Sequence, residues 1–163
     1  MKRFVLVLAM AAIAAVPALA QQMAGERGEA SLALDKGKVS VEYGRPSLKG
    51  RDLTQMMKPG VEWRLGSNSP TTLTTSVPLT FGATKVPAGT YVLRAKLNDD
   101  KTWTLVFLKQ GDNARVGETP LTLGTAGDSA EMLTMGLERA GTGGKLNVHW
   151  GTLMLTTPFE AGS

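Results

Sequence analysis

Alternation of apolar and polar side chains with a period of two is the feature of this sequence that most limits its fold. From residue 30 onward, apolar residues recur at every second position, and Gly, Pro, Asn or Asp interrupts the pattern at short intervals. Successive side chains of a β-strand point to opposite faces of a sheet, so this pattern is typical of antiparallel strands with one buried face. The sequence therefore predicts an all-β domain.

Three β-hairpins are predicted where short stretches rich in Gly, Asn, Asp or Lys join two alternating segments. In the second hairpin, Tyr91, Leu93 and Ala95 share one face, and Arg94 and Lys96 share the other. The predicted hairpins are residues 32–43, 91–107 and 132–150.

Shorter strands are predicted at 61–65, 71–76 and 79–81, and one helical turn at 53–57, ended by Pro59. Residues 110–130 contain four glycines, and we expect them to form a long connection with one strand, PLTLG, inside it. About eight to ten short strands with turns between them favour a single antiparallel β-sandwich, with a small closed β-barrel as the alternative.

The N-terminus has the composition of a secretory signal peptide. Lys2 and Arg3 precede an apolar run at residues 4–16, which is followed by Pro17 and the small-residue segment 18–20. The run is shorter than the roughly 20 residues that a membrane-spanning helix needs. We therefore expect cleavage after Ala20, a single domain at residues 21–163, and a secreted or periplasmic protein that does not span the membrane.

Composition narrows the possible partners. The chain has no cysteine, so neither a disulfide nor a lipid anchor attached through cysteine is possible. Removal of Lys2 and Arg3 with the signal peptide lowers the net charge from +4 to +2, with 16 basic residues left against 14 acidic ones. This small excess does not support nucleic-acid binding, so any electrostatic function must come from a local cluster.

The residue types also limit the chemistry. His149 is the only histidine, so a catalytic triad would depend on it, yet alternation places it opposite Val148 and Trp150, toward solvent or a sheet flank. No zinc or calcium ligand pattern and no nucleotide-binding motif is present, so we expect no metal and no cofactor. We expect a protein that is not an enzyme, although a hydrolase using Asp52 or Glu62 stays an alternative.

Two loops carry more than turn chemistry, GRPSLKGR and WRLGSNSP. Arginine side chains can hold a carboxylate, sulfate or phosphate with two hydrogen bonds, and tryptophan can stack on a sugar ring. The loops could form one pocket for an anionic or sugar-like ligand, or their arginines could instead fix the loops by bonding main-chain carbonyls and nearby acids. The candidate ligand-binding residues are Arg45, Ser47, Lys49, Arg51, Trp63, Arg64 and Asn68.

Several motifs together resemble the DUF2911 family of secreted bacterial proteins: VEYGRPSLKGR, VEWRLGSNSPTTLT, VPAGTYVL, WTLVFLK and the closing HWGTLMLTTPF. The resemblance covers residues 30–110 and 145–159. It implies a β-rich envelope or secreted domain of unknown function. The chain departs from the family's pattern at Ser69, where an acidic residue is common, and at Leu53 and Thr54, where an aromatic-glycine pair is common. The positions that match the family signature are Arg45, Pro46, Gly50, Arg51, Trp63, Arg64, Gly66, Asn68, Pro87, Gly89, Tyr91 and Trp150.

Three functions stay open from the sequence. The first is a binding module for an anionic or carbohydrate ligand, the second is a hydrolase at the same pocket, and the third is a structural or interaction protein of the envelope whose strand edges pair with a partner.

Overall fold

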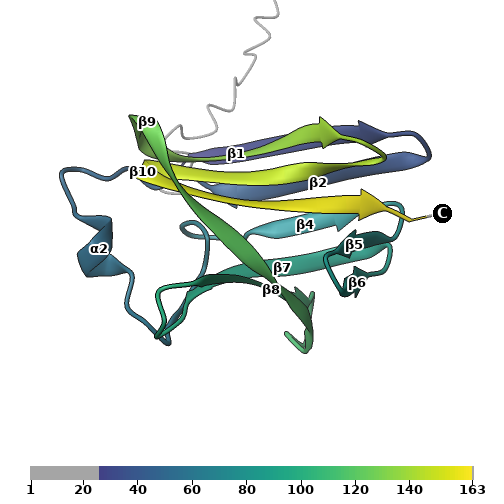
Figure 1. Ribbon diagram of the computed structural model, residues 1–163, viewed down its shortest axis with the longest axis horizontal. Coiled ribbons are helices and arrows are strands. Elements are labelled where there is room, and N and C mark those ends of the chain that lie inside the picture. Colours follow the sequence, from purple (N-terminus) through teal and green to yellow (C-terminus); the bar gives the residue numbers. More distant parts are fainter. Residues whose placement is uncertain (1–25, 163) are drawn as a thin grey trace, which may run out of the picture.

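The computed structural model describes residues 26–162, where ten β-strands and one short helix are present (Figure 1). The predicted signal peptide, residues 1–20, lies outside the described residues. In chain order the elements are β1 (Arg27–Leu34), β2 (Gly37–Gly44), α2 (Leu53–Met56), β3 (Glu62–Trp63), β4 (Thr72–Thr75), β5 (Leu79–Phe81), β6 (Thr84–Val86), β7 (Gly89–Leu97), β8 (Trp103–Lys109), β9 (Arg115–Ala140) and β10 (Gly143–Ala161).

All three predicted hairpins are confirmed, as β1/β2, β7/β8 and the junction of β9 with β10. The predicted turn residues form the turns. In the β7/β8 turn, Asp100 Oδ1 accepts a hydrogen bond of 3.0 Å from the Thr102 N–H, and Lys101 takes the left-handed conformation with φ 70°. A short acidic side chain that binds the main chain two residues on is typical of such turns.

The apolar side chains of the period-two pattern are buried between the two layers of the sheet and form the hydrophobic core. Leu93 and Ala95 on β7 are fully buried, whereas Arg94 on the other face is partly exposed. The Phe81 ring packs 4.8 Å from that of Phe107 and 5.3 Å from that of Phe159, measured between ring centroids. Burial of aromatic and aliphatic side chains of this kind is the main favourable term in folding.

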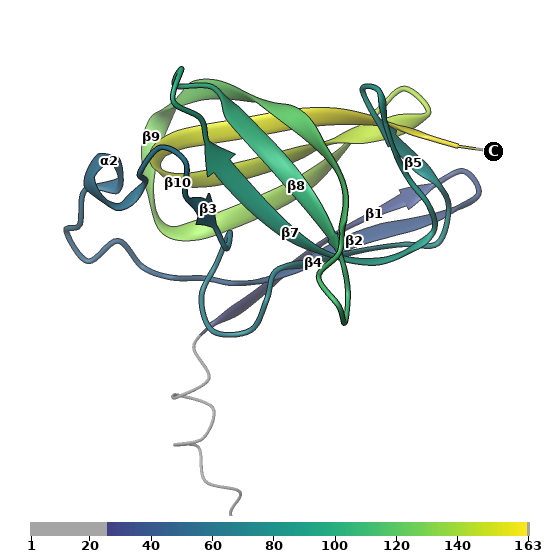
Figure 2. The same ribbon diagram turned by 90° about the horizontal axis from the view of Figure 1, so that it is seen from below.

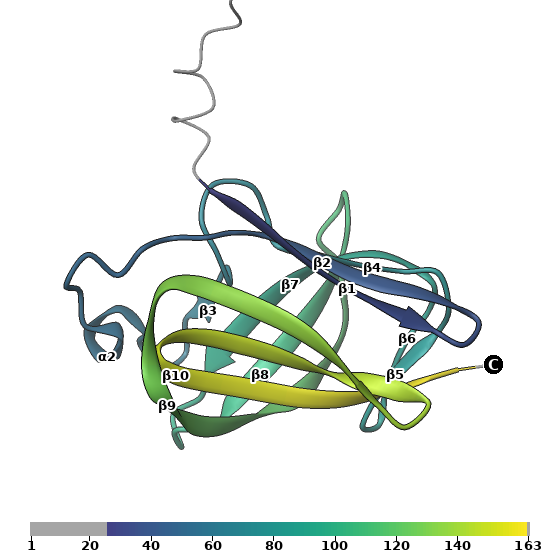
Figure 3. The same ribbon diagram turned by 90° about the horizontal axis from the view of Figure 1, so that it is seen from above.

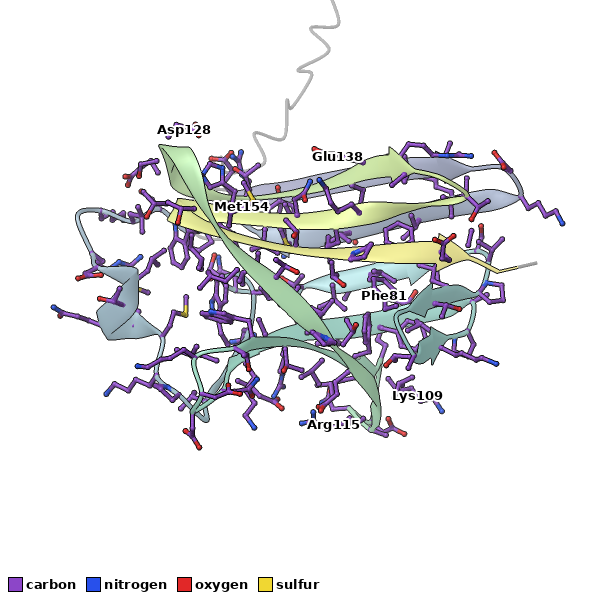
Figure 4. The ribbon with its side chains drawn as sticks, viewed as in Figure 1. Phe81, Lys109, Arg115, Asp128, Glu138 and Met154 are labelled. Atoms are coloured by element: carbon purple, nitrogen blue, oxygen red, sulfur yellow. The ribbon has the colours of Figure 1, made fainter. Side chains whose placement is uncertain are left out.

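β9 belongs to both layers of the molecule. Its first part pairs with β8 as far as Leu121, and from Thr122 onward it pairs with β10. In Figure 1 the strand crosses from one layer to the other. The strand then turns at residues 126–129, which have no partner on β10: Thr125 pairs with Leu153 and Ala130 with Gly151. Figure 4 labels Asp128 at this corner.

β10 turns back on itself in the same region, so that its two parts lie side by side (Figure 3). Gly151, with φ 57°, lies at this reversal. The main chain of Phe159 comes so close to Gly143 that a Cβ atom there would have no room. Glycine is therefore required at both positions, for the conformation at Gly151 and for the close approach at Gly143.

The strands form one antiparallel sheet in the order β1-β2-β4-β7-β8-β9-β10-β5-β6, with β3 added beside β7. The sheet folds over into two layers, which Figure 2 shows from the β7/β8 side. The predicted all-β sandwich is confirmed in this form. The order begins at β1 and ends at β6, so the sheet is not closed into a barrel.

Side chains bridge the seam where the sheet stays open. The Tyr43 hydroxyl on β2 accepts a hydrogen bond of 2.9 Å from the Met135 N–H on β9 and donates one of 3.3 Å to the Met135 carbonyl. At the far end of the seam, Arg139 donates to the carbonyl of Ala33 and pairs with Asp35 at 2.6 Å. These side chains bond the main-chain groups of Met135 on β9 and link Arg139 of the same strand to the end of the β1/β2 hairpin.

The expectation of a long connection at residues 110–130 was wrong. Only the turn before Arg115 lies outside the strand, and residues 115–130 belong to β9, including its corner at 126–129. Thr119 and Leu121 are buried at alternate positions, but Leu123 is 54% exposed. The alternation of apolar residues around positions 119–123 is therefore too weak to predict this part of the strand from its own sequence. Strand β6 was not predicted either.

The predicted helical turn is present as α2, at one end of the two layers. Asp52 is its N-cap, since Oδ1 accepts a hydrogen bond of 2.9 Å from the Thr54 N–H. The helix ends before Pro59, as expected from the missing N–H of proline. No helix within residues 26–162 has the length and apolar character needed to cross a lipid bilayer.

Candidate functional site

The GRPSLKGR loop is paired with β9 along its first part. Ser47 and Met132 form an isolated antiparallel bridge. On either side of it, the Leu48 N–H donates to the Glu131 carbonyl at 2.9 Å and the Leu133 N–H donates to the Pro46 carbonyl at 3.0 Å. The loop therefore acts as a short additional strand on the free edge of β9.

Arg45 is engaged by the protein's own groups. Its Nε donates to the Leu133 carbonyl at 3.1 Å, and Nη2 donates to Thr134 Oγ1 at 3.2 Å. Its Nη1 forms an ion pair of 2.6 Å with Glu26. All three nitrogens of this guanidinium thus bond groups of the protein, and the side chain links the end of β2 to β9.

Glu131 fixes the middle of the loop. One of its carboxylate oxygens accepts a short hydrogen bond from the Ser47 hydroxyl and one of 2.8 Å from the Lys49 N–H. The hydrogen bond from Ser47, and then that from Lys49, lowers the pKa of the Glu131 carboxyl, with a further contribution from the charge of Arg51. Glu131 is therefore ionised at neutral pH and holds Lys49 in its left-handed conformation of φ 48°.

Arg51 is held at the end of the loop but stays exposed. Its Nε donates to the Leu48 carbonyl at 3.0 Å and its Nη2 to the Ser47 carbonyl at 2.6 Å. These bonds direct the guanidinium to the rim of a cleft of about 730 Å³ beside α2. Among the three candidate arginines, Arg51 is the one that faces this cleft.

The cleft combines an apolar floor with a charged rim. Lys101, from the β7/β8 turn, lines it together with Arg51, whereas Asp52 is its single carboxylate. The Asp52 carboxylate accepts two hydrogen bonds from Thr54, and these lower its pKa. The apolar wall is formed by Leu48, Leu53, Met57, Leu97, Trp103 and Leu153.

The second predicted loop lines a different and smaller cavity, of about 250 Å³. Trp63 and Arg64 contribute to it, and Arg64 Nη2 donates to the Asn68 carbonyl at 2.9 Å. Asn68 has a φ of 62°, which sets the turn of this loop. The two loops approach each other where Gly44, the first residue of one, lies against the main chain of Ser67 in the other.

The tryptophan rings between the cavities pack against each other. Trp63 stacks on Trp150 with a centroid distance of 5.8 Å, and it meets Trp103 edge-on at 6.5 Å. Trp150 is 2% exposed and Trp103 is 5% exposed. No open face of these two rings is therefore offered to a sugar.

His149 lies apart from both cavities. It is half-buried on β10, and its Nε2 atom is buried without a hydrogen-bond partner among the described residues. Residues 26–162 contain no group of three or more His, Asp or Glu side chains that could hold a metal ion. The nearest acid to the cleft floor is Asp52, which already caps α2.

Sequence reasoning missed the parts of the cleft that come from distant segments. Lys101 lies in the predicted hairpin 91–107 and Leu153 in the closing motif HWGTLMLTTPF, and neither was predicted as a site residue. Glu131, which holds the candidate loop, lies 84 residues from Ser47. Only the turn position of Lys101 gave a signal in the sequence, and it did not indicate which loop it would face.

The comparisons with known proteins agree with the motif resemblance. Residues 26–159 match the family model described as "Protein of unknown function (DUF2911)". Neither the curated proteins nor the solved structures give a significant match. The family match joins the two segments that the motifs covered separately and extends through β9. This chain therefore belongs to the DUF2911 family.

Proposed function

We propose that the protein is a non-enzymatic module that binds a small amphipathic anion in the cleft beside α2. The observation that carries this proposal is the pairing of Arg51 and Lys101 with an apolar floor that includes Trp103 and Leu97. A volume of about 730 Å³ suits a small molecule, since ligand pockets commonly measure about 300–1,000 Å³.

Charge complementarity favours an anion. Within residues 26–162, the Lys101 side chain forms no hydrogen bond or ion pair, and the Nη1 of Arg51 forms none either, whereas its Nε and Nη2 are bonded. Asp52 is the only opposing charge on the rim, and its carboxylate is engaged by Thr54. An anionic head group at this rim could bind both Arg51 and Lys101, and the one carboxylate beside it, Asp52, is already hydrogen-bonded to Thr54.

Two alternatives are less well supported. A sugar would need an open aromatic face, whereas Trp150 and Trp103 are buried. A hydrolase would need a general acid with a raised pKa, whereas the pKa of Asp52 is lowered by its bonds to Thr54. We therefore favour binding over catalysis at this cleft.

We place this binding outside the cytoplasm because residues 1–20 have the order of a signal peptide. N-terminal sequencing of the protein recovered from an expressing bacterium should start at Gln21. Recovery of protein that still starts at Met1 would contradict this assignment.

The binding test measures thermal unfolding of the protein from Gln21 onward with decanoate and with decanol, both below micelle-forming concentrations. Decanoate should raise Tm, by the equivalent of about 2.7 kcal/mol at a hundred times its Kd, and decanol should raise it less. Lys101→Gln and Arg51→Gln should each reduce the gain. Arg64→Gln is the matched control, because Arg64 is also exposed and bonded to a carbonyl but lines the other cavity. Equal shifts from decanol, or an undiminished shift in both cleft variants, would refute the proposal.

A further inference from the structure

The smaller cavity, of about 250 Å³, has cations of its own. Lys58, which follows α2, and Arg64, which follows β3, both line it. Neither of them lines the larger cleft, where the cations are Arg51 and Lys101. Each of the two spaces therefore receives one arginine and one lysine.

The acid that lines the smaller cavity, Glu62, is already paired with arginines that do not line it. Its Oε2 lies 3.4 Å from Nη1 of Arg94, and its Oε1 bonds Nη2 of Arg115. Arg115 also forms an ion pair of 2.8 Å with Glu118. The two acids and the two arginines of this network cancel in charge. The charge of Glu62 is thus balanced before the cations of the cavity are counted.

Both cations of the cavity have N–H groups that the protein leaves unused. Within residues 26–162, the Lys58 side chain forms no hydrogen bond or ion pair, and Arg64 is bonded only through Nη2, to the Asn68 carbonyl. The main chain of both residues is held in place. The Val61 N–H donates to the Lys58 carbonyl at 3.2 Å, and β3 pairs with β7 directly before Arg64. The unused donors are therefore carried on fixed segments at one cavity.

Apolar side chains lie beside these cations. Met56 and Val61 line the cavity and are 40% and 59% exposed. Trp63 lines it as well. Exposed apolar side chains that gather at one place indicate contact with a ligand or partner more than single scattered ones do. A ligand that fits this cavity therefore combines a charged group with a small apolar part.

Two cations without an opposing charge favour a doubly charged group. A phosphate monoester carries a charge of about −1.5 to −2 at neutral pH, whereas a carboxylate carries a single charge. Arginine binds phosphate through its planar set of N–H donors, and lysine binds it as a point charge. The volume is below the roughly 300–1,000 Å³ of pockets for larger molecules, so it suits a phosphate group with a short substituent.

We infer that the smaller cavity is a second binding site, which takes the phosphate group of a monoester between Lys58 and Arg64 and its apolar substituent against Met56 and Val61. This site goes beyond the function proposed for the larger cleft and does not depend on it. The same group occurs in small soluble monoesters and in the head group of phosphatidic acid.

The test is calorimetric titration of the protein from Gln21 onward with inorganic phosphate, butyl phosphate and pentanoate, at an ionic strength held constant with sodium chloride. Butyl phosphate should bind more tightly than phosphate, by up to about fourfold for each methylene that the apolar side chains cover. Pentanoate has the same butyl chain on a singly charged group and should bind more weakly than butyl phosphate. Lys58→Gln and Arg64→Gln should each weaken the binding of butyl phosphate at least about tenfold.

Lys85→Gln is the matched control. Lys85 is an exposed lysine on β6 that lines neither cavity, so its removal changes the net charge equally and should leave the affinity for butyl phosphate unchanged. Thermal melts without ligand show which variants are folded. Because the Lys58 side chain bonds no described residue, Lys58→Gln tests the site even if Arg64→Gln weakens its own loop.

Equal affinity for butyl phosphate and pentanoate, or an affinity for butyl phosphate that Lys58→Gln leaves unchanged, would overturn the inference. Binding that is lost in Lys101→Gln but kept in Lys58→Gln would also overturn it, because the ligand would then lie in the larger cleft. The decanoate test of that cleft uses other variants, so either proposal can fail while the other stands.

Vesicles identify the source of the phosphate group once butyl phosphate is shown to bind. Sedimentation of the protein with vesicles of phosphatidylcholine and phosphatidic acid, but not with phosphatidylcholine alone, would assign the group to a lipid. Protein that binds butyl phosphate and stays in the supernatant with both kinds of vesicle would assign it to a soluble monoester.

Discussion

Tyr43→Phe is the substitution that best tests how the open sheet is held together. The Tyr43 hydroxyl bonds both main-chain groups of Met135, across 92 residues of sequence. Tyr43 is 3% exposed, and so is Met135. Phenylalanine would keep the ring and its packing, and would remove only the atom that satisfies the edge of β9.

The expected cost follows from what is left unpaired. A buried N–H and a buried carbonyl would lose their partner at a place with little access for water. Leaving a buried polar group without a hydrogen bond costs about 1–3 kcal/mol. We expect a loss of this size in the free energy of unfolding, and a fall in Tm of about 3–5 °C for each kcal/mol in a domain of this length.

Urea denaturation and thermal melts of the protein from Gln21 onward measure this loss. The matched control is Tyr91→Phe at the only other tyrosine in the chain. The Tyr91 hydroxyl donates to the Pro87 carbonyl at 2.7 Å, and Pro87 is exposed, so water can replace that bond. Tyr91→Phe should therefore cost less. If Tyr43→Phe is as mild as the control, the side-chain seam does not stabilise the open sheet as argued.

Two further predictions concern the loop and the corner beside the cleft. Hydrogen bonds from Ser47 and Lys49 hold the pKa of Glu131 below its ordinary value of 4.5, so its contribution to stability is present above 4.5 and is lost as the pH falls through the lowered folded-state value. Between about pH 6 and pH 3, the free energy of unfolding should decrease less steeply for Glu131→Gln than for the unaltered chain. Identical slopes for the two proteins would contradict this. Gly151→Ala places a side chain at φ 57° with its Cβ 3.3 Å from a methyl carbon of Leu53, and should cost about 1–2 kcal/mol in urea denaturation. Gly136→Ala, with open space around it, should be nearly neutral, and an equal cost at both glycines would refute the conformational argument.

Local patterns predicted the hairpins because their information lies within a few residues. In β7/β8 the alternation of buried and exposed positions and the Asp100 turn are both readable in one window. The helical turn was predictable for the same reason, since Asp52 and Pro59 mark its limits within eight positions.

The first part of β9 and the cleft could not be predicted in this way. β9 serves two layers, so its buried face changes along the strand, and no single period describes it. The cleft joins Leu48, Lys101 and Leu153 from three distant segments. Alternation gives the face of a side chain but not which other strands lie next to it, and sheet order was not available from the pattern.

The two arginines of the GRPSLKGR loop make different contacts, although each follows a glycine. Arg45 lies where the loop pairs with β9, and its three nitrogens are bonded within the protein. Arg51 lies beyond that pairing, where the main chain turns away from β9 toward α2, and its bonds to Ser47 and Leu48 direct it outward. The loop is thus anchored by one arginine in a way that presents the other.

The residue that holds the loop, Glu131, also contacts a tryptophan. The Glu131 carbonyl, which accepts from the Leu48 N–H, also accepts a hydrogen bond of 3.3 Å from Trp150 Nε1. Trp150 in turn stacks on Trp63, which lines the smaller cavity. Glu131 therefore connects the rim of the large cleft with the wall of the small one. Arg51, Trp63 and Trp150, which are far apart in the sequence, are thus linked through Leu48 and Glu131.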